Sequence, residues 1–317
     1  MLSVLGITFP FFALVLCGYV ATRRGMLPQP AIPGLNAFVL YFALPALLFR
    51  FGATTPIVQY LDAGLVGVYT ACALIMVAFN MALMRSARTG WNDAAFSALA
   101  TAFPNTGYMG VPLLVALFGE RAAGPAIVTI LIDLLVTSSL CVALSRLGSA
   151  GSHGAAVAFR HALKGVVANP MPWAILIGAA SYAAAIELPG PVMQTIGLIA
   201  DSASPVALFT IGAMLARSQM TAVLHTPWTQ YVPPALMKLI LHPLLVLALG
   251  VSAIGLGVQL DRFALTILIL VAALPSASNV AVLAERFGAD NGRVARIILV
   301  STALAFLTFS AAVALVT

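Results

Sequence analysis

The sequence predicts an all-α integral membrane protein of ten transmembrane helices, arranged as a 5+5 inverted repeat in which helices 4 and 9 are broken and cross. Three observations support this prediction: the composition, the number of long apolar runs, and motifs that recur in order in the two halves. The 317 residues are 62% hydrophobic and 8% charged, whereas a soluble domain is about 25% charged. A soluble fold cannot hide so much apolar surface from water, so a lipid bilayer is the expected environment.

Ten apolar runs approach the length of about 20 residues that a membrane-spanning helix needs. They cover about residues 2–22, 34–51, 61–84, 94–118, 122–144, 166–186, 192–216, 228–253, 263–287 and 293–316. The first run lacks a basic start and a small-residue cleavage site before Arg23, which favours a first span over a cleaved signal.

The distribution of Lys and Arg predicts the orientation, because cytoplasmic loops are rich in these residues. Eleven of the fifteen lie in odd-numbered connections, three in even-numbered ones, and Lys238 lies within a run. The odd-numbered connections are therefore expected in the cytoplasm and both termini outside it. We expect a multi-pass protein of the bacterial inner membrane.

Motifs recur between residues 1–145 and 166–317, which are joined by a short basic linker, 146–165. The matching positions are Pro10 and Gly18 with Pro170 and Gly178; Pro45, Leu48, Phe49 and Gly52 with Pro205, Leu208, Phe209 and Gly212; and Pro104 with Pro275. Each half holds five runs, an odd number, so the halves enter the membrane from opposite sides. Inverted repeats with broken helices at corresponding positions are typical of secondary transporters.

Two stretches interrupt these runs: FPNTGYMGVP, Phe103 to Pro112, and LPSASN, Leu274 to Asn279. Proline removes a helical hydrogen bond, and irregular backbone at membrane depth is tolerated only inside protein or beside a watery cavity. Paired breaks would form a small neutral pocket whose helix ends favour carboxylates. The alternative is a pair of kinked helices whose polar groups merely bond nearby backbone. The expected substrate contacts are Asn105, Thr106, Gly107, Ser276, Ser278 and Asn279, and the candidates for the crossing point are Pro104, Pro112 and Pro275.

Ionisable side chains inside apolar runs are costly and often couple transport to ions. The candidates are Asp133, Asp201, Lys238 and His242. Lys238 and His242 are four residues apart and so share a helical face. The alternative role is structural, as a buried ion pair or as a Lys that extends to the interface.

Several functional classes are disfavoured. The chain has no GxxxxGK[ST], HExxH or GxSxG motif, so we expect no enzyme activity and no cofactor. The three cysteines lie in different runs without a Cys/His cluster, so no metal site is expected. Basic residues are scattered over short loops, which argues against nucleic-acid binding.

Four strings resemble the auxin efflux carrier family, in its bacterial, malonate-transporter-like branch. They are PNTGYMGVPLL (Pro104 to Leu114), ALPSASNVAVLAERFG (Ala273 to Gly288), LPALLF in the second run, and KLILHPLL (Lys238 to Leu245). The resemblance covers nearly the whole chain. It implies ten spans, broken helices that cross at their prolines, a scaffold of helices 1, 2, 6 and 7, and a moving transport part of helices 3–5 and 8–10. It also implies a small organic anion as substrate, with Asn105, Thr106 and Asn279 as polar contacts.

We therefore expect a secondary active transporter of a malonate-like carboxylate that works by elevator-type alternating access in the bilayer. Proton coupling or uniport is favoured over sodium coupling, because few carboxylates lie near the breaks. The alternatives are an anion channel, an auxin-like aromatic carboxylate efflux carrier, and a membrane ligand sensor that does not transport. The small residues of the first and sixth runs permit a homodimer without requiring one.

Overall fold

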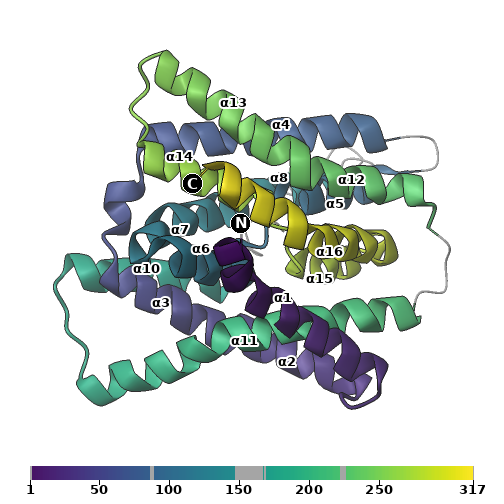
Figure 1. Ribbon diagram of the computed structural model, residues 1–317, viewed down its shortest axis with the longest axis horizontal. Coiled ribbons are helices and arrows are strands. Elements are labelled where there is room, and N and C mark those ends of the chain that lie inside the picture. Colours follow the sequence, from purple (N-terminus) through teal and green to yellow (C-terminus); the bar gives the residue numbers. More distant parts are fainter. Residues whose placement is uncertain (1, 86–88, 147–166, 168, 222–225, 317) are drawn as a thin grey trace. The chain divides into compact units, whose positions relative to one another are not determined.

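Every secondary-structure element that the computed structural model describes is helical (Figure 1). The described residues are 2–85, 89–146, 167, 169–221 and 226–316, so most of the predicted linker lies outside them. Seven helical stretches in the described part are long and apolar enough to cross a membrane, which confirms the predicted multi-pass class. These stretches are Gly6–Arg23, Gln29–Thr54, Ala63–Met84, Glu120–Arg146, Gly190–Met220, Val232–Gly255 and Asn291–Val316.

The chain divides into two compact units. Unit 1 comprises Met1–Leu61, Thr106–Val128 and Asn169–Thr221, and unit 2 comprises Asp62–Asn105, Thr129–Ala168 and Ala222–Thr317. The chain therefore passes from unit 2 to unit 1 between Asn105 and Thr106, inside the first predicted break.

Unit 1 is built on two pairs of packed helices, α1 with α11 and α3 with α10 (Figure 1). Pro10 lies inside α1 and Pro205 inside α11. The elements of unit 1 are α1 (Leu2–Arg23), η1 (Gln29–Ala31), α2 (Ile32–Phe38), η2 (Val39–Ala43), α3 (Leu44–Thr54), η3 (Ile57–Tyr60), η4 (Thr106–Gly110), α6 (Val111–Phe118), η5 (Glu120–Ala122), α10 (Pro170–Ala183) and α11 (Gly190–Thr221), while α7 (Ala123–Ile132) begins in unit 1 and ends in unit 2.

Glycines allow the two helix pairs of unit 1 to approach closely. A Cβ at Gly18 would collide with the backbone carbonyl of Phe209, and a Cβ at Gly178 would collide with that of Phe49. These residues are two of the pairs that recur 160 positions apart in the sequence. In the α1–α11 contact the glycine comes from the first half of the chain and the Phe from the second. In the α10–α3 contact the glycine comes from the second half and the Phe from the first.

Unit 2 contains the second interrupted run and the part of the first that ends at Asn105. Helix α4 packs on α5 and α13, α5 on α8, and α16 on α12, α14 and α15. The elements of unit 2 are α4 (Ala63–Met84), α5 (Trp91–Ala102), η6 (Asp133–Thr137), α8 (Ser138–Arg146), η7 (Trp228–Gln230), α12 (Val232–Leu236), η8 (Met237–Leu241), α13 (His242–Gly255), α14 (Arg262–Ala273), α15 (Asn279–Arg286) and α16 (Asn291–Val316).

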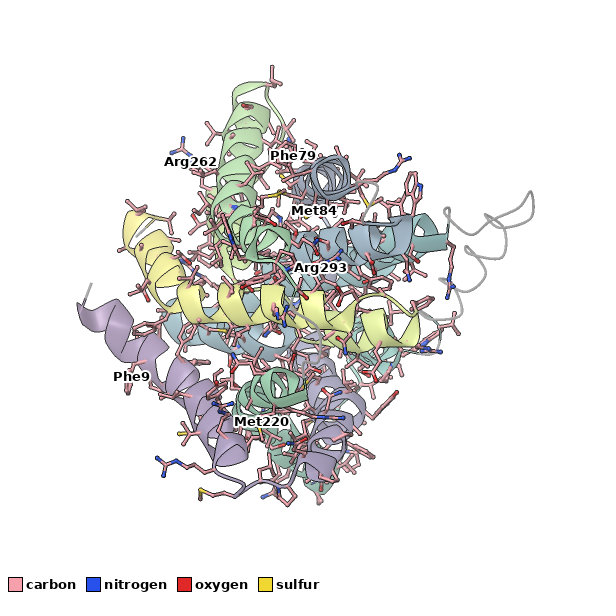
Figure 2. The ribbon with its side chains drawn as sticks, turned by 90° about the vertical axis from the view of Figure 1, so that its right-hand side faces the viewer. Phe9, Phe79, Met84, Met220, Arg262 and Arg293 are labelled. Atoms are coloured by element: carbon pink, nitrogen blue, oxygen red, sulfur yellow. The ribbon has the colours of Figure 1, made fainter. Side chains whose placement is uncertain are left out.

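The helices of both units carry apolar side chains on their outer faces. Phe9 on α1 and Phe79 on α4 point away from their helices with exposed fractions of 60% and 50% (Figure 2). In water such side chains would cost free energy in proportion to their apolar area. In a bilayer they would face hydrocarbon at no such cost, consistent with a membrane protein.

Both predicted breaks interrupt helices. Helix α5 ends at Ala102, one residue before Phe103, and α14 ends at Ala273, two residues before Pro275. Pro112, by contrast, is the second residue of α6, a position where a missing N–H costs little. The first break is therefore centred on Phe103 to Asn105, and helical structure resumes from Thr106.

Candidate functional site

The two breaks of unit 2 are joined by backbone hydrogen bonds. Pro104 and Ser276 form an isolated antiparallel bridge. The Asn105 N–H donates to the Pro275 carbonyl at 2.8 Å, and the Ala277 N–H donates to the Phe103 carbonyl at 3.0 Å. Each break thus supplies hydrogen-bond partners to backbone groups that the other helix left unpaired where it ended. Backbone groups at membrane depth need such partners.

A hydroxyl on α16 supports the second break from the side. The Ser301 Oγ accepts a hydrogen bond from the Ser276 N–H at 3.2 Å and lies 3.2 Å from the Ser276 Oγ. Both serines are fully buried. Ser301 was not among the contacts predicted from the sequence, although Ser301 and Thr302 form a polar pair inside an apolar run, a signal that could have identified it.

Two polar side chains at the breaks, and one next to Ser301 in the sequence of α16, keep an oxygen without a hydrogen-bond partner in the described part of unit 2. These oxygens are Asn105 Oδ1, Asn279 Oδ1 and Thr302 Oγ1. Asn105 is only 2% exposed and Thr302 4%. A buried polar atom without a partner costs roughly 1–3 kcal/mol, so this group is a candidate ligand site.

The remaining predicted contacts are placed as follows. Ser278 is buried and gives α15 no side-chain cap, although it occupies the capping position. Thr106 and Gly107 begin η4, a π-helical turn assigned to unit 1. The Thr106 hydroxyl is buried without a partner in the described residues, and Gly107 has open space where a Cβ would lie.

A buried charged cluster, formed by Tyr69, Asp133, Thr137, Lys238 and His242, lies elsewhere in unit 2. Asp133 accepts hydrogen bonds from the Tyr69 hydroxyl at 2.8 Å and from the Thr137 hydroxyl at 3.0 Å. The Lys238 Nζ lies 3.2 Å from the His242 Nδ1. The ring centroids of Tyr69 and His242 are 6.3 Å apart, which links the acidic and basic sides of the cluster.

The charged cluster reaches the second break through Lys238. Its ammonium donates to the carbonyl of Ala272, in the last turn of α14. Helix ends leave carbonyls unpaired and carry partial negative charge, so a cation there is stabilising. Asp133 and Lys238 each lie in a π-helical turn, η6 and η8, a feature frequent at functional sites.

Asp201 lies apart from this cluster. It belongs to α11 of unit 1 and forms an ion pair with Arg50 of α3, with 2.7 Å between Oδ1 and Nη1. Its side chain is 68% exposed. Arg50, which the charge count places in a loop, lies within α3. Of the four predicted coupling residues, the structure thus brings together Asp133, Lys238 and His242.

No group of three His, Cys, Asp or Glu side chains within the described ranges could hold a metal ion. The breaks offer amides, hydroxyls and helix ends, groups that suit a small organic anion. Tyr69 and Thr137 were not predicted from the sequence, because a Tyr or Thr in an apolar run carries no motif.

The family model "Membrane transport protein" matches residues 3–149 and 155–313. The chain is 29% identical over 310 residues, 97% of its length, to a "Putative malonate transporter" of Rhizobium meliloti, 94% of which is covered. It is 25% identical over 286 residues to the "Uncharacterized transporter YfdV" of Escherichia coli, with 89% and 88% of the two chains covered. It is also 29% identical over 147 residues to "Auxin efflux carrier component 7" of Arabidopsis thaliana, which spans 45% of this chain and 23% of that protein.

Proposed function

Because the chain belongs to the membrane transport protein family, that of the auxin efflux carriers, we propose that it is a secondary carrier of a small organic anion, a malonate-like carboxylate. The observation that carries this proposal is the pair of breaks joined at Pro104 and Ser276, with Asn105 and Asn279 beside them. A carrier for an anion needs hydrogen-bond donors, which amides, hydroxyls and helix N-termini can supply without a fixed charge. The breaks contain such groups.

Amide side chains can present donors to a carboxylate. Each amide has an oxygen acceptor and an NH₂ donor, and its orientation is fixed only by its hydrogen bonds. Since Oδ1 of Asn105 and of Asn279 has no partner in the described part of unit 2, either amide can turn its NH₂ toward a bound carboxylate. Asn279 is also the first residue of α15, where a helix N-terminus attracts negative charge.

For the architecture, we propose ten spans in a 5+5 inverted repeat, with broken helices 4 and 9 crossing at Pro104 and Ser276. The exchanged contacts Gly18–Phe209 and Gly178–Phe49 support the repeat, because they relate positions 160 residues apart. We place the odd-numbered connections in the cytoplasm and both termini outside it, in a bacterial inner membrane. The small residues of spans 1 and 6 permit a homodimer, which the mass of the protein in detergent would test.

We propose an elevator-type mechanism in which helices 3–5 and 8–10 move and helices 1, 2, 6 and 7 stay fixed. The division of the chain supports this assignment, since unit 1 holds α1, α2, α3, α10 and α11 while unit 2 holds α4, α5, α8 and α12 to α16. The segment Thr106–Val128, which holds the second half of span 4 and the start of span 5, clusters with unit 1, so the moving part would comprise helices 3–5 without this segment.

We further propose that transport is linked to protons through Asp133, Lys238 and His242. Asp133 is fully buried with two hydroxyl donors, and Lys238 is equally buried against a backbone carbonyl and an imidazole. Burying a charge costs several kcal/mol, so a change in protonation here would change the energy of this region strongly. Its contact with Ala272 offers a direct connection to the second break.

The test is uptake of labelled malonate into proteoliposomes, with and without a pH gradient, for the wild type, Asn105→Ala and Ser97→Ala. Ser97 is a matched control, because its Oγ is also buried without a partner in the described ranges but lies in the middle of α5. We expect saturable, gradient-driven uptake that Asn105→Ala reduces at least ~10-fold and Ser97→Ala leaves within about 2-fold, because only the first would contact substrate.

Other outcomes identify the competing functions. Uptake unaffected by Asn105→Ala would contradict a site at the breaks. Transport of indole-3-acetate in place of malonate would indicate an aromatic carboxylate carrier. A conductance without saturation would indicate an anion channel, and binding without uptake would indicate a sensor.

A further inference from the structure

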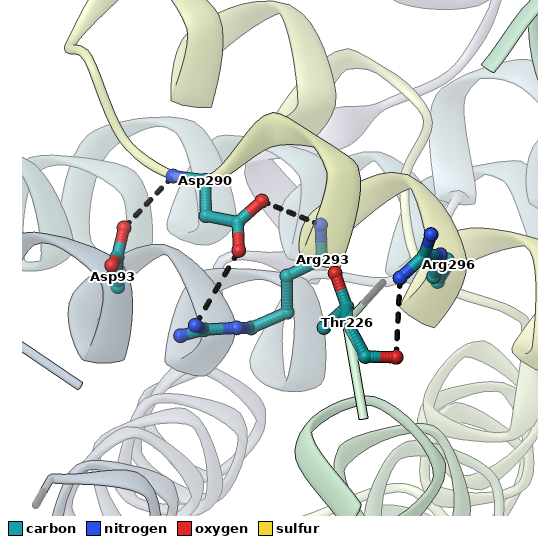
Figure 3. Close-up of polar contacts among 5 residues, drawn as sticks. All are labelled: Asp93, Thr226, Asp290, Arg293 and Arg296. Carbon is teal, nitrogen blue, oxygen red and sulfur yellow. Dashed lines mark hydrogen bonds and ion pairs between the residues drawn. The ribbon is translucent and has the colours of Figure 1, made fainter. Parts of the chain in front are cut away.

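Arg293 is a buried arginine outside the breaks and outside the charged cluster. It is the third residue of α16 and its side chain is only 6% exposed. Its Nη2 lies 3.4 Å from the Asp290 Oδ2. Figure 3 shows the side chain extending from the first turn of α16 toward Asp290. Arginine is rarely buried to this degree unless it is paired.

Asp290 cannot accept hydrogen bonds from the other nitrogens of the Arg293 guanidinium. Its Oδ1 accepts the backbone N–H of Arg293 at 3.0 Å, which caps the start of α16, and its own N–H donates to the Asp93 Oδ1 at 2.8 Å (Figure 3). Asp290 is therefore held at both its backbone and its side chain. A rotation to reach another nitrogen of Arg293 would break the cap.

Two nitrogens of the guanidinium remain without a partner. Both Nε and Nη1 of Arg293 are buried and make no hydrogen bond in the part of the chain that the structure describes. They carry three of the five N–H donors of an arginine. Leaving donors of a charged group unsatisfied costs more than the roughly 1–3 kcal/mol of a neutral group, so the geometry points to a bound acceptor.

We propose that Arg293 forms a second binding site for a small carboxylate, separate from the site at the breaks. Arginine is the side chain best suited to carboxylates, because its planar donors match their oxygens. The start of α16 adds the partial positive charge of a helix N-terminus. The choice of a carboxylate as ligand rests on the proposed function, whereas the existence of an anion site rests on the unpartnered donors.

One malonate ion cannot occupy both sites. Arg293 precedes Ser301, the residue of α16 that is bonded to the second break, by eight residues, a rise of about 12 Å along the helix. The nearby carboxylates of Asp290 and Asp93 reduce the local positive charge. The second site therefore binds more weakly than the first.

The test is the stoichiometry of malonate binding to the full chain in detergent, measured by isothermal titration calorimetry in a low-chloride buffer. We expect two sites in the wild type, one in Arg293→Gln, and one weaker site in Asn105→Ala. Arg293→Lys keeps the charge but loses the planar donors, so it retains the second site with about 10-fold lower affinity. This variant serves as the second test if Arg293→Gln does not fold.

Arg296→Gln is the matched control, because Arg296 lies one turn further along α16 and already donates to the Thr226 carbonyl at 3.2 Å (Figure 3). It is expected to keep both sites. Equal stoichiometry in the wild type and Arg293→Gln would overturn the second site while leaving the breaks intact. A loss confined to Arg293→Gln, with Asn105→Ala unchanged, would support the second site and contradict the proposed site at the breaks. No binding of malonate to the wild type would overturn both.

Discussion

The two half-helices that lead into the breaks end in different chemical surroundings, although both lie in unit 2. At the end of α5, the Asn80 amide donates to the Thr101 hydroxyl at 2.9 Å. At the end of α14, the Lys238 ammonium donates to the Ala272 carbonyl. Asn80 comes from α4, which directly precedes α5, and Lys238 from η8, part of the helical stretch Val232–Gly255 that precedes α14. One end is thus anchored by a neutral side chain and the other by a buried charge.

The two breaks are therefore alike in backbone geometry but differ in their chemical surroundings. The backbone exchange between Phe103 and Ala277 and between Asn105 and Pro275 treats the two breaks alike. A cation beside one helix end and not the other makes the electrostatic surroundings unequal. In the described part of unit 2, a hydrogen bond from Lys238 joins the charged cluster to the end of α14, so the proposed proton coupling would act on the second break first.

The largest effect is expected for Lys238→Met, which keeps most of the volume and removes the charge. Breaking a buried charge interaction costs about 3–5 kcal/mol, which corresponds to at least a ~100-fold loss if it is expressed in the transport rate. Malonate uptake in proteoliposomes and the melting temperature in detergent measure the two consequences.

Arg262→Met is the control for Lys238→Met, because it removes a positive charge from the exposed start of α14, the helix whose last turn Lys238 contacts (Figure 2). It should change uptake by less than about 2-fold, as is usual for surface sites. Uptake by Lys238→Met within about 3-fold of the wild type, at an unchanged melting temperature, would show that the charge at Ala272 is dispensable.

A smaller effect, and a direct test of symmetry, is expected from Asn279→Ala compared with Asn105→Ala. If a carboxylate contacts both breaks, each substitution removes one hydrogen bond to a charged group, worth about 1.5–3 kcal/mol. Both variants should then raise the apparent KM for malonate by similar factors, about 10–100-fold. A difference of more than 10-fold between them would mean that one break alone holds the substrate.

The sequence predicted the positions of both breaks because Pro104 and Pro275 leave a strong local signal in apolar runs. It did not decide between Pro104 and Pro112, because that choice depends on a long-range pairing. In the structure Pro104 pairs with Ser276, whereas Pro112 lies in the first turn of α6. The repeated glycines Gly18 and Gly178 were also visible in sequence, but their backbone contacts were not.

Only part of the charged cluster could be predicted from the sequence. Asp133 and Lys238 were visible as charges in apolar runs, but their surroundings depend on Tyr69 and Thr137, which resemble ordinary core residues until the helices pack. Asp201 gave the same signal as Asp133 and proved to be 68% exposed and paired with Arg50. Sequence position alone cannot separate a buried charge from an exposed one, because burial depends on which neighbouring helix covers that face.

The smallest effect is expected for Asn80→Ala, the counterpart of Lys238→Met at the neutral end. It removes the hydrogen bond to Thr101, worth about 1 kcal/mol, and a weak contact with the Met237 Sδ at 4.0 Å. Thr101 keeps its bond to the Ser97 carbonyl at 2.9 Å. The melting temperature should fall by roughly 2–4 °C and uptake by less than about 5-fold. If Asn80→Ala were as damaging as Lys238→Met, the two helix ends would depend equally on their anchors, and the charge at the second end would have no special role. A small loss of uptake in Asn80→Ala together with a large loss in Lys238→Met would show that transport is sensitive to charge at the end of α14.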